Sequence, residues 1–111
     1  MKQKPEAPFA VADQIRVLGE RIRVARVRRR MSQDDLARAC GISRTTLVRM
    51  EAGSPRATLG ATYSVLWTLG LLPTAAGIAD PDTDEHGKTL EAARAAKRVR
   101  RSRGPADDND F

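Results

Sequence analysis

The stretch SQDDLARACGISRTTLVRMEAG, residues 32–53, decides how this chain folds. Ser32 and Ser43 each suit the N-cap of a helix, because a serine hydroxyl accepts a hydrogen bond from the free N–H groups of the first turn. Between them stands Gly41, which adopts a positive φ angle at no steric cost. The pattern predicts two short helices joined by a tight turn, the second of which ends before Gly53.

Apolar residues recur at helical spacing in both predicted helices. The expected core positions are Leu36, Ala37, Cys40, Leu47 and Met50. This phase turns four polar residues of the second helix away from the core, namely Arg44, Thr45, Thr46 and Arg49. An arginine- and threonine-bearing face at a helix N-terminus can enter the major groove of DNA, as in a helix-turn-helix motif. An ordinary helical hairpin with a polar face is the alternative.

The charges of the chain are unevenly spread. Twenty Lys+Arg residues against fourteen Asp+Glu residues give a net charge of +6. Residues 16–56 hold eleven arginines and four acidic residues, a local balance of +7. Residues 91–103 hold six basic residues and one acidic residue, and the last eight residues hold three aspartates. Such a basic region points to a polyanion as partner, with nucleic acid first, and a solubilising surface is the alternative.

The chain offers few side chains for catalysis. Its only histidine, His86, lies in a polar stretch, and its single cysteine, Cys40, falls on an apolar position expected to be buried. Neither a nucleophile with its base nor a set of metal ligands can be assembled, so we expect no enzyme, no metal and no cofactor. The N-terminus is too polar for a signal peptide, and no apolar run reaches the roughly 18 residues of a membrane helix. We therefore expect a cytoplasmic protein with no membrane partner.

Further helices are predicted on both sides of the central stretch. Residues 1–10 are expected to be a disordered arm, after which Asp13 caps a helix that runs to Arg30. The inward residues of that helix are expected to be Ile15, Leu18, Ile22 and Ala25. Thr58 opens a fourth helix, whose expected core positions are Leu59, Tyr63, Leu66 and Leu69.

The chain after the fourth helix becomes steadily more polar. Pro73 suits the first turn of a short fifth helix that ends at Asp80. Residues 11–79 would then form one helical domain, and residues 80–111 a tail. Residues 88–99 contain good helix formers but a thin apolar face, so a helix there would be marginal alone. A disordered segment, basic and then acidic, is expected to follow it.

The central stretch also resembles a known family. Arg23 and Arg26 are followed by S-Q-x-x-L-A-x-x-x-G-I-S-x-x-x-L-x-x-x-E-x-G over residues 32–53. This arrangement resembles the lambdoid repressor type of DNA-binding domain, also called the Cro/C1 or xenobiotic-response-element type. The resemblance covers roughly residues 13–79. It implies an all-α fold, a five-helix lambda repressor-like domain with a helix-turn-helix, followed by the helical or disordered C-terminal tail.

The resemblance implies which residues would read bases. Arg44 and Thr45 would reach base edges, and Arg49, one turn further, would make a base or phosphate contact. Arginine at position 44 favours guanine, because it can bond O6 and N7 together.

The resemblance also implies phosphate contacts and one structural pair. Gln33 would bond a phosphate while orienting the second helix of the motif. Further phosphate contacts are expected from Ser43, Thr46, Arg28, Arg29 and Arg30. The arginine triplet has an alternative explanation, since positive charge complements the dipole at a helix C-terminus. Arg26 and Glu51 match an ion pair that ties the first helix to the end of the third.

The tail resembles a subset of short antitoxins of bacterial type II toxin–antitoxin pairs, most closely the HipB type, which partners HipA-type serine/threonine kinases. The matching residues are Asp80, Pro81, Asp84, Gly87, Leu90, Lys97, Arg98 and Arg100. The resemblance implies a homodimer that binds a palindromic double-stranded DNA operator and represses the operon of its own toxin. Trp67 would lie either in the core or in the dimer contact. The alternatives are a stand-alone repressor and a protein-binding inhibitor or adaptor with incidental DNA contacts.

Overall fold

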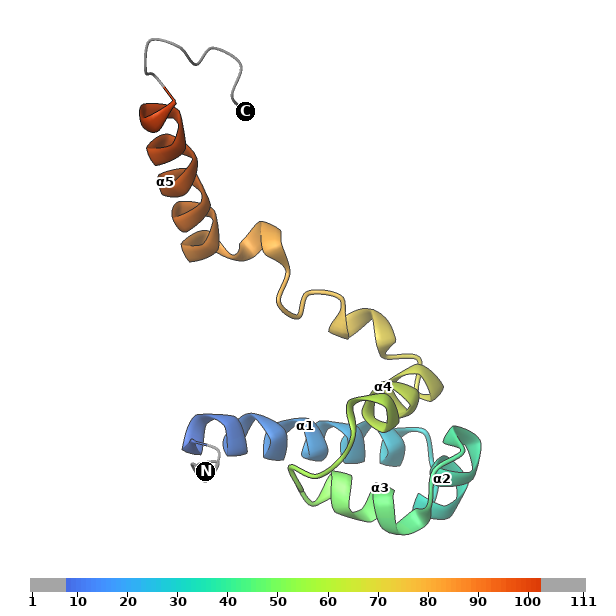
Figure 1. Cartoon of the computed structure of the whole chain (residues 1–111). Coiled ribbons are helices and arrows are strands. Elements are labelled where there is room, and N and C mark those ends of the chain that lie inside the picture. The colour runs from blue at the N-terminus through green and yellow to red at the C-terminus, as the bar shows by residue number, and fades with distance from the viewer. Residues whose placement is uncertain (1–7, 103–111) are drawn as a thin grey trace. The chain divides into compact units, whose positions relative to one another are not determined.

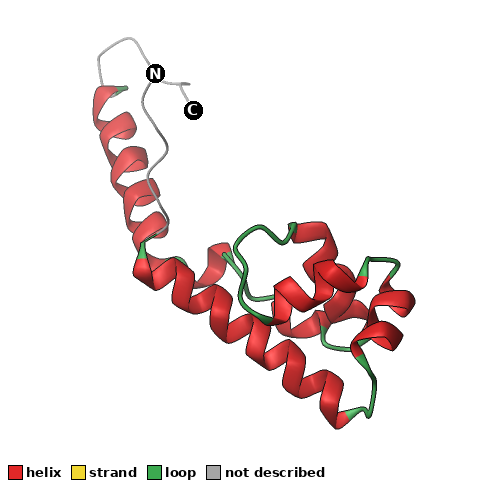
Figure 2. Ribbon diagram, turned by 90° about the horizontal axis from the view of Figure 1, so that it is seen from below, coloured by secondary structure: helices red, strands yellow, loops and turns green. Residues whose placement is uncertain are grey.

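Helices make up all the regular structure in the computed structural model of this protein, which describes residues 8–102 (Figure 2). No strand occurs within these residues, so the all-α fold expected from the sequence is confirmed. The chain divides into two compact units, Met1–Ala75 and Ala76–Phe111.

Four α-helices form the first unit. They are α1 (Phe9–Arg28), α2 (Gln33–Cys40), α3 (Arg44–Glu51) and α4 (Leu59–Thr68) (Figure 1). A single turn of 3₁₀ helix, Leu72–Ala75, follows α4 and buries no residue. The expectation of a fifth α-helix from Pro73 to Asp80 is therefore wrong beyond this turn. Without a buried face, no tertiary packing supports a longer helix here.

Helix α1 begins earlier than expected, at Phe9. The predicted cap at Asp13 is wrong, because the Asp13 carboxylate instead accepts a hydrogen bond from Nη2 of Arg16 at 2.9 Å on the helix surface. Pro8 precedes the helix with φ of −59°, an angle that proline favours and that suits entry into a helix. Phe9 and the next residue thus belong to the helix rather than to the expected arm, and residues 1–7 lie outside the described residues.

A small apolar core lies between the four helices of the first unit. It consists of Ile22, Ala25, Leu36, Ala37, Leu47, Met50, Val65, Leu66 and Leu69. All the core positions expected from α2 and α3 are in this set except Cys40, which is half-buried and packs at its edge. The two short helices therefore bury the face that their apolar spacing predicts.

Two of the four core positions expected for the fourth helix, Leu66 and Leu69, are buried, and the other two are not. Thr62 and Val65 are buried, whereas Leu59 is 71% exposed and Tyr63 is half-buried. Trp67 was expected either in the core or in a dimer contact. It is 69% exposed, which excludes the core. The apolar residues of α4 are spaced so that two neighbouring faces are plausible, and packing against α2 selects one of them.

Helix α1 approaches α3 through a glycine. Gly19 is buried, and a Cβ atom at this position would collide with the main-chain oxygen atoms of Met50 and Glu51. Ile15 is only half-buried and Leu18 is 38% exposed, although both were expected to face inward. Gly19 is thus the residue that lets the two backbones lie against each other.

The second unit contains a 3₁₀ turn, Pro81–Thr83, and helix α5 (Glu85–Arg101), of which no residue is buried. The helix is longer at both ends than the expected residues 88–99. It starts early because the Asp84 carboxylate accepts a hydrogen bond from the Gly87 N–H at 2.9 Å. His86, expected in a loop, is an exposed residue of this helix. The segment after residue 99 was expected to be disordered, but Arg100 and Arg101 belong to the helix, and residues 103–111 lie outside the described residues.

None of the helices within residues 8–102 combines the length and the apolar character needed to span a bilayer. The same residues contain no group of three or more His, Cys, Asp or Glu side chains that could hold a metal ion.

Candidate nucleic-acid interface

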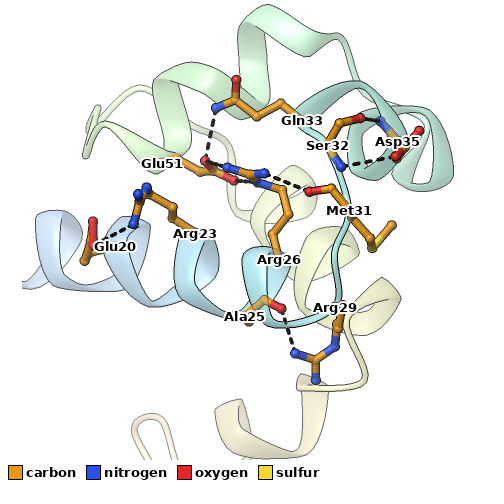
Figure 3. Close-up of polar contacts among 10 residues, drawn as sticks. All are labelled: Glu20, Arg23, Ala25, Arg26, Arg29, Met31, Ser32, Gln33, Asp35 and Glu51. Atoms are coloured by element: carbon orange, nitrogen blue, oxygen red, sulfur yellow. Dashed lines mark hydrogen bonds and ion pairs between the residues drawn. The ribbon is translucent and has the colours of Figure 1, made fainter.

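Both helices of residues 32–53 begin at a serine cap. The Ser32 hydroxyl accepts a hydrogen bond from the Asp35 N–H at 3.0 Å, and the Asp35 carboxylate accepts one from the Ser32 N–H at 3.1 Å (Figure 3). The backbone bond from Ser32 lowers the pKa of Asp35, because the ionised carboxylate is the better acceptor. In α3, the Ser43 hydroxyl accepts a hydrogen bond from the Thr46 N–H at 3.0 Å. The starts of α2 and α3 are therefore set by local contacts.

The turn between these helices depends on Gly41, whose φ of 73° lies in the left-handed region. Its N–H donates to the Arg38 carbonyl at 3.2 Å, and the Ile42 N–H donates to the Ala37 carbonyl at 3.0 Å. These bonds close α2 and turn the chain towards the cap of α3. The result is a helix, a turn of three residues and a second helix.

Helix α3 has one buried and one exposed side. Leu47, Met50 and Glu51 are buried, and they hold the helix against α1 and α2. The three expected base-contact residues, Arg44, Thr45 and Arg49, are all exposed. The structure thus brings these three together on the free side of α3, mostly in its first turn.

The other two expected contacts of α3 are tied to its cap. The hydroxyls of Ser43 and Thr46 lie 2.8 Å apart and share a hydrogen bond, in addition to the cap itself. Only one of the two hydroxyl protons is used in this shared bond, so the hydroxyl that accepts keeps its own proton for an outside acceptor such as a phosphate. The Thr46 N–H is already used in the cap, so the remaining hydroxyl proton is the donor that the pair offers towards a phosphate.

An ion pair joins α1 to the end of α3. Nε and Nη2 of Arg26 donate to the two carboxylate oxygens of Glu51 at 2.7 and 3.0 Å, and Nη1 donates to the Met31 carbonyl at 2.8 Å (Figure 3). The side chains are only 12% and 4% exposed. The hydrogen bonds to Glu51 raise the pKa of Arg26 against the opposing effect of burial. This bidentate pair fixes the first helix relative to the exposed face of α3.

Gln33 lies on the same network. Its side-chain amide donates to Oε1 of Glu51 at 3.0 Å, and the residue is half-buried (Figure 3). An amide nitrogen carries two N–H groups, so one remains for another acceptor. The structure therefore gives Gln33 an orienting contact and leaves a donor for the expected phosphate bond.

The arginine triplet follows the end of α1. Arg28 is the last helical residue, Arg29 is the C-cap and Arg30 has a positive φ of 56°. Nη1 of Arg29 donates to the Ala25 carbonyl at 2.8 Å, which satisfies a free carbonyl of the last turn. Arg29 thus has the contact that the helix-end explanation requires, while all three residues are exposed.

Sequence reasoning missed one residue of this surface. Oδ1 of Asp34, at the start of α2, lies 3.6 Å from Nε of Arg44, at the start of α3. The two residues are too far apart along the chain for helical spacing to relate them. Only the folding back of the turn at Gly41 brings them together.

A family model described as a helix-turn-helix domain matches residues 17–76, which is more than half of the chain. The chain belongs to this helix-turn-helix family. A curated relative, the uncharacterized HTH-type transcriptional regulator y4mF of Sinorhizobium fredii (strain NBRC 101917 / NGR234), is 38% identical over 53 residues. The aligned residues are 48% of this chain and 70% of the relative. No solved structure gives a significant match.

The helix-turn-helix match coincides with the first unit. Residues 17–76 include most of α1, all of α2, α3 and α4, and the 3₁₀ turn that follows them. Helix α5 lies outside the matched residues. The family membership therefore concerns the unit that carries Arg44, and the second unit has to be interpreted from its own residues.

Proposed function

We propose that this protein is a sequence-specific DNA-binding transcriptional repressor. The observation that carries the proposal is the exposed side of α3, the second helix of the helix-turn-helix, which presents Arg44, Thr45 and Arg49 to solvent. A helix so placed fits the major groove, where an arginine can bond guanine O6 and N7 together. The similarity to a transcriptional regulator supports the same function.

Phosphate contacts complete the proposed interface. Gln33, Ser43 and Thr46 lie at the starts of α2 and α3, where helix N-termini favour an anion. Arg28, Arg29 and Arg30 add positive charge at the end of α1. These contacts would set the register of α3 on the duplex without reading its sequence.

We propose that the repressor acts as a homodimer on a palindromic operator. Trp67 is 69% exposed on α4, and a large exposed aromatic side chain is a common anchor of protein–protein contacts. A two-fold dimer presents two α3 helices to two half-sites, roughly 34–36 Å apart, so half-sites would be centred about 10 base pairs apart.

The finer proposal is an antitoxin that represses its own toxin–antitoxin operon, with a HipA-type kinase as the toxin. The second unit supports this proposal, because no residue of its helix α5 is buried. A helix without a buried face gains stability by docking on a partner. A stand-alone repressor and a protein-binding adaptor with incidental DNA contacts remain the alternatives to this role.

A selection experiment tests the DNA-binding proposal. A randomised duplex library is incubated with the protein, and the bound fraction is sequenced. The proposal expects enrichment of a palindrome whose half-sites contain a guanine that Arg44 reads. Binding that is sensitive to salt but indifferent to sequence would contradict it and favour the adaptor.

The spacing of the half-sites tests the dimer. Inserting about five base pairs between them turns one half-site to the opposite side of the duplex. Affinity should then fall to that of a single half-site. Unchanged affinity would mean that monomers bind independently.

A further inference from the structure

Three acidic residues lie on α2 and α3, and two of them have clear structural roles. Asp35 completes the capping box with Ser32, and Glu51 accepts hydrogen bonds from Arg26. Asp34 is different. Its side chain is 60% exposed, and the partner that the described residues offer its carboxylate is the guanidinium of Arg44.

The position of Asp34 is unfavourable for DNA binding in general. It stands at the start of α2, beside residues proposed to contact phosphates, and a carboxylate there repels the DNA backbone. A negative charge in the first turn of α2 does complement the helix dipole. That benefit is available from Asp35 as well, which is in the same turn and bonds the backbone directly.

The geometry of the pair leaves Arg44 able to read a base. Oδ1 of Asp34 lies 3.6 Å from Nε of Arg44, which is an ion-pair distance and too long for a hydrogen bond. Nε is the inner nitrogen of the guanidinium group. The two terminal nitrogens therefore stay free, and they are the pair that can bond guanine O6 and N7 end-on.

We propose that Asp34 is a specificity-determining residue that positions Arg44. It holds the guanidinium group over the exposed side of α3, and its charge opposes the alternative in which Arg44 bonds a phosphate of any sequence. Asp34 thus lowers affinity for DNA in general and sharpens the choice of one base pair. This inference rests on the proposed DNA-binding function.

The test compares the wild-type protein with Asp34→Asn, which keeps the shape of the side chain and removes its charge. The probe is the randomised duplex library, selected with each protein, followed by titration of the enriched duplex and of a random duplex at several salt concentrations.

Asp34→Asn should bind random DNA more tightly and steepen the dependence of log K on log salt by up to about one unit. Enrichment at the base pair that Arg44 reads should fall roughly two- to five-fold, the range allowed by the coupling of an exposed ion pair. Asp13→Asn is the matched control, because it breaks an exposed Asp–Arg pair on α1, and it should leave both quantities unchanged.

The outcomes separate this inference from the function on which it rests. If the wild-type protein enriches no sequence, the proposed function fails. If it enriches a palindrome and Asp34→Asn enriches the same palindrome equally strongly, the positioning role is overturned while the function stands. Tighter binding to all DNA with an unchanged base preference overturns the positioning role too, because Asp34 would then act only as a repulsive charge. A lower melting temperature without a change in preference would reduce Asp34 to a helix-dipole contact and likewise overturn the inference.

Discussion

Arg26 is largely buried and Arg44 is exposed, and this difference in burial decides what each guanidinium group can bind. Arg26 is 12% exposed, and it donates to Glu51 through Nε and Nη2 and to the Met31 carbonyl through Nη1, so its donors stabilise the fold. Arg44 is 65% exposed, and its partner Asp34 leaves the terminal nitrogens free. Arginine therefore stabilises the fold at position 26 and is a candidate base contact at position 44.

Removing the Arg44 side chain should change which DNA is bound more than how stably the protein folds. Arg44→Ala should weaken binding to the preferred duplex by about 1–3 kcal/mol, the value of one bidentate base contact, and relax the preference at one base pair. Arg16→Ala is the control, since it removes one exposed arginine from α1 outside the helix-turn-helix. Titration of the preferred duplex and of single-base variants measures both effects. An equal loss on all sequences would make Arg44 a phosphate contact instead.

Breaking the buried ion pair should destabilise the whole first unit. Glu51→Gln removes the charge that faces Arg26 and leaves a guanidinium group buried without its counter-ion, which costs about 3–5 kcal/mol. That is a large part of the roughly 5–15 kcal/mol available to a small domain. Glu20→Gln breaks the exposed pair with Arg23 and should cost at most about 1 kcal/mol. Urea unfolding measures the stability of both variants. Equal midpoints would show that the Arg26–Glu51 pair contributes no more than a surface pair.

Among the helices, those with side-chain caps were the easiest to locate from sequence. Ser32, Ser43 and Thr58 all cap helices where expected, because a cap acts over three residues and needs no distant partner. The start of α1 was misplaced because Pro8 provides no side-chain cap, while Asp13 is equally suited to a surface pair inside a helix.

Features that depend on packing between helices could not be read from the sequence. The buried face of α4 is chosen by its neighbours, which is why Leu59 is exposed and Thr62 is buried. The contact between Asp34 and Arg44 requires the turn at residue 41 to bring two helix starts together. The exposure of Arg44, Thr45 and Arg49 on α3 was predictable, because the spacing of Leu47 and Met50 identifies the buried side of the helix.

The capping box of α2 should make its stability depend on pH. The folded-state pKa of Asp35 lies below the ordinary value of 3.8, so the contribution of the carboxylate is complete above that pH. It is lost as the pH falls through the lower, folded-state pKa. The difference in stability between wild type and Asp35→Ala should therefore be constant from about pH 7 to 5 and shrink towards pH 3. Urea unfolding at these pH values measures it, with Asp13→Ala as the control for an exposed pair. A difference that does not change with pH would mean that the cap is not formed by the ionised carboxylate.

The glycines of the first unit should respond to substitution for different reasons. Gly41 has φ of 73° and open space around its missing Cβ, so Gly41→Ala should cost about 1–2 kcal/mol of backbone strain, and Gly41→Asn less. Gly19→Ala and Gly19→Asn should both be severe, because the new Cβ would meet the main chain of α3, which cannot move aside without disrupting the core. Gly60 has neither constraint, so Gly60→Ala should stabilise α4 by roughly 0.5–1 kcal/mol. Thermal melts rank the variants, and tolerance of asparagine at position 19 would contradict the close approach of α1 to α3.

Within residues 8–102, the first unit has an apolar core, whereas the second unit has no buried residue. All the core residues belong to the first unit, and α5 in the second buries none. The helix-turn-helix match stops at residue 76, so the family accounts for one unit only. A chain built in this way can divide its tasks, with DNA recognition in the first unit and partner binding in the second.

Deleting residues 81–111 tests this division. The deletion leaves every core residue and every proposed base contact in place, so the truncated chain should fold and should bind the selected duplex within a few-fold of the wild type. The same deletion removes α5, which has a capped start at Asp84 and several basic residues in its last turns but no buried face of its own. Such a helix is marginal in water and becomes ordered when a partner covers it. Co-expression with a kinase-like protein encoded next to this one, followed by pull-down, should therefore recover the kinase with the full chain and not with the truncation.

Undiminished capture of the kinase by the truncated chain would place the partner interface on the first unit. Loss of duplex binding would show instead that the basic residues of α5 contact phosphates, and a truncation carrying Arg44→Ala would then reveal whether base preference still resides in α3.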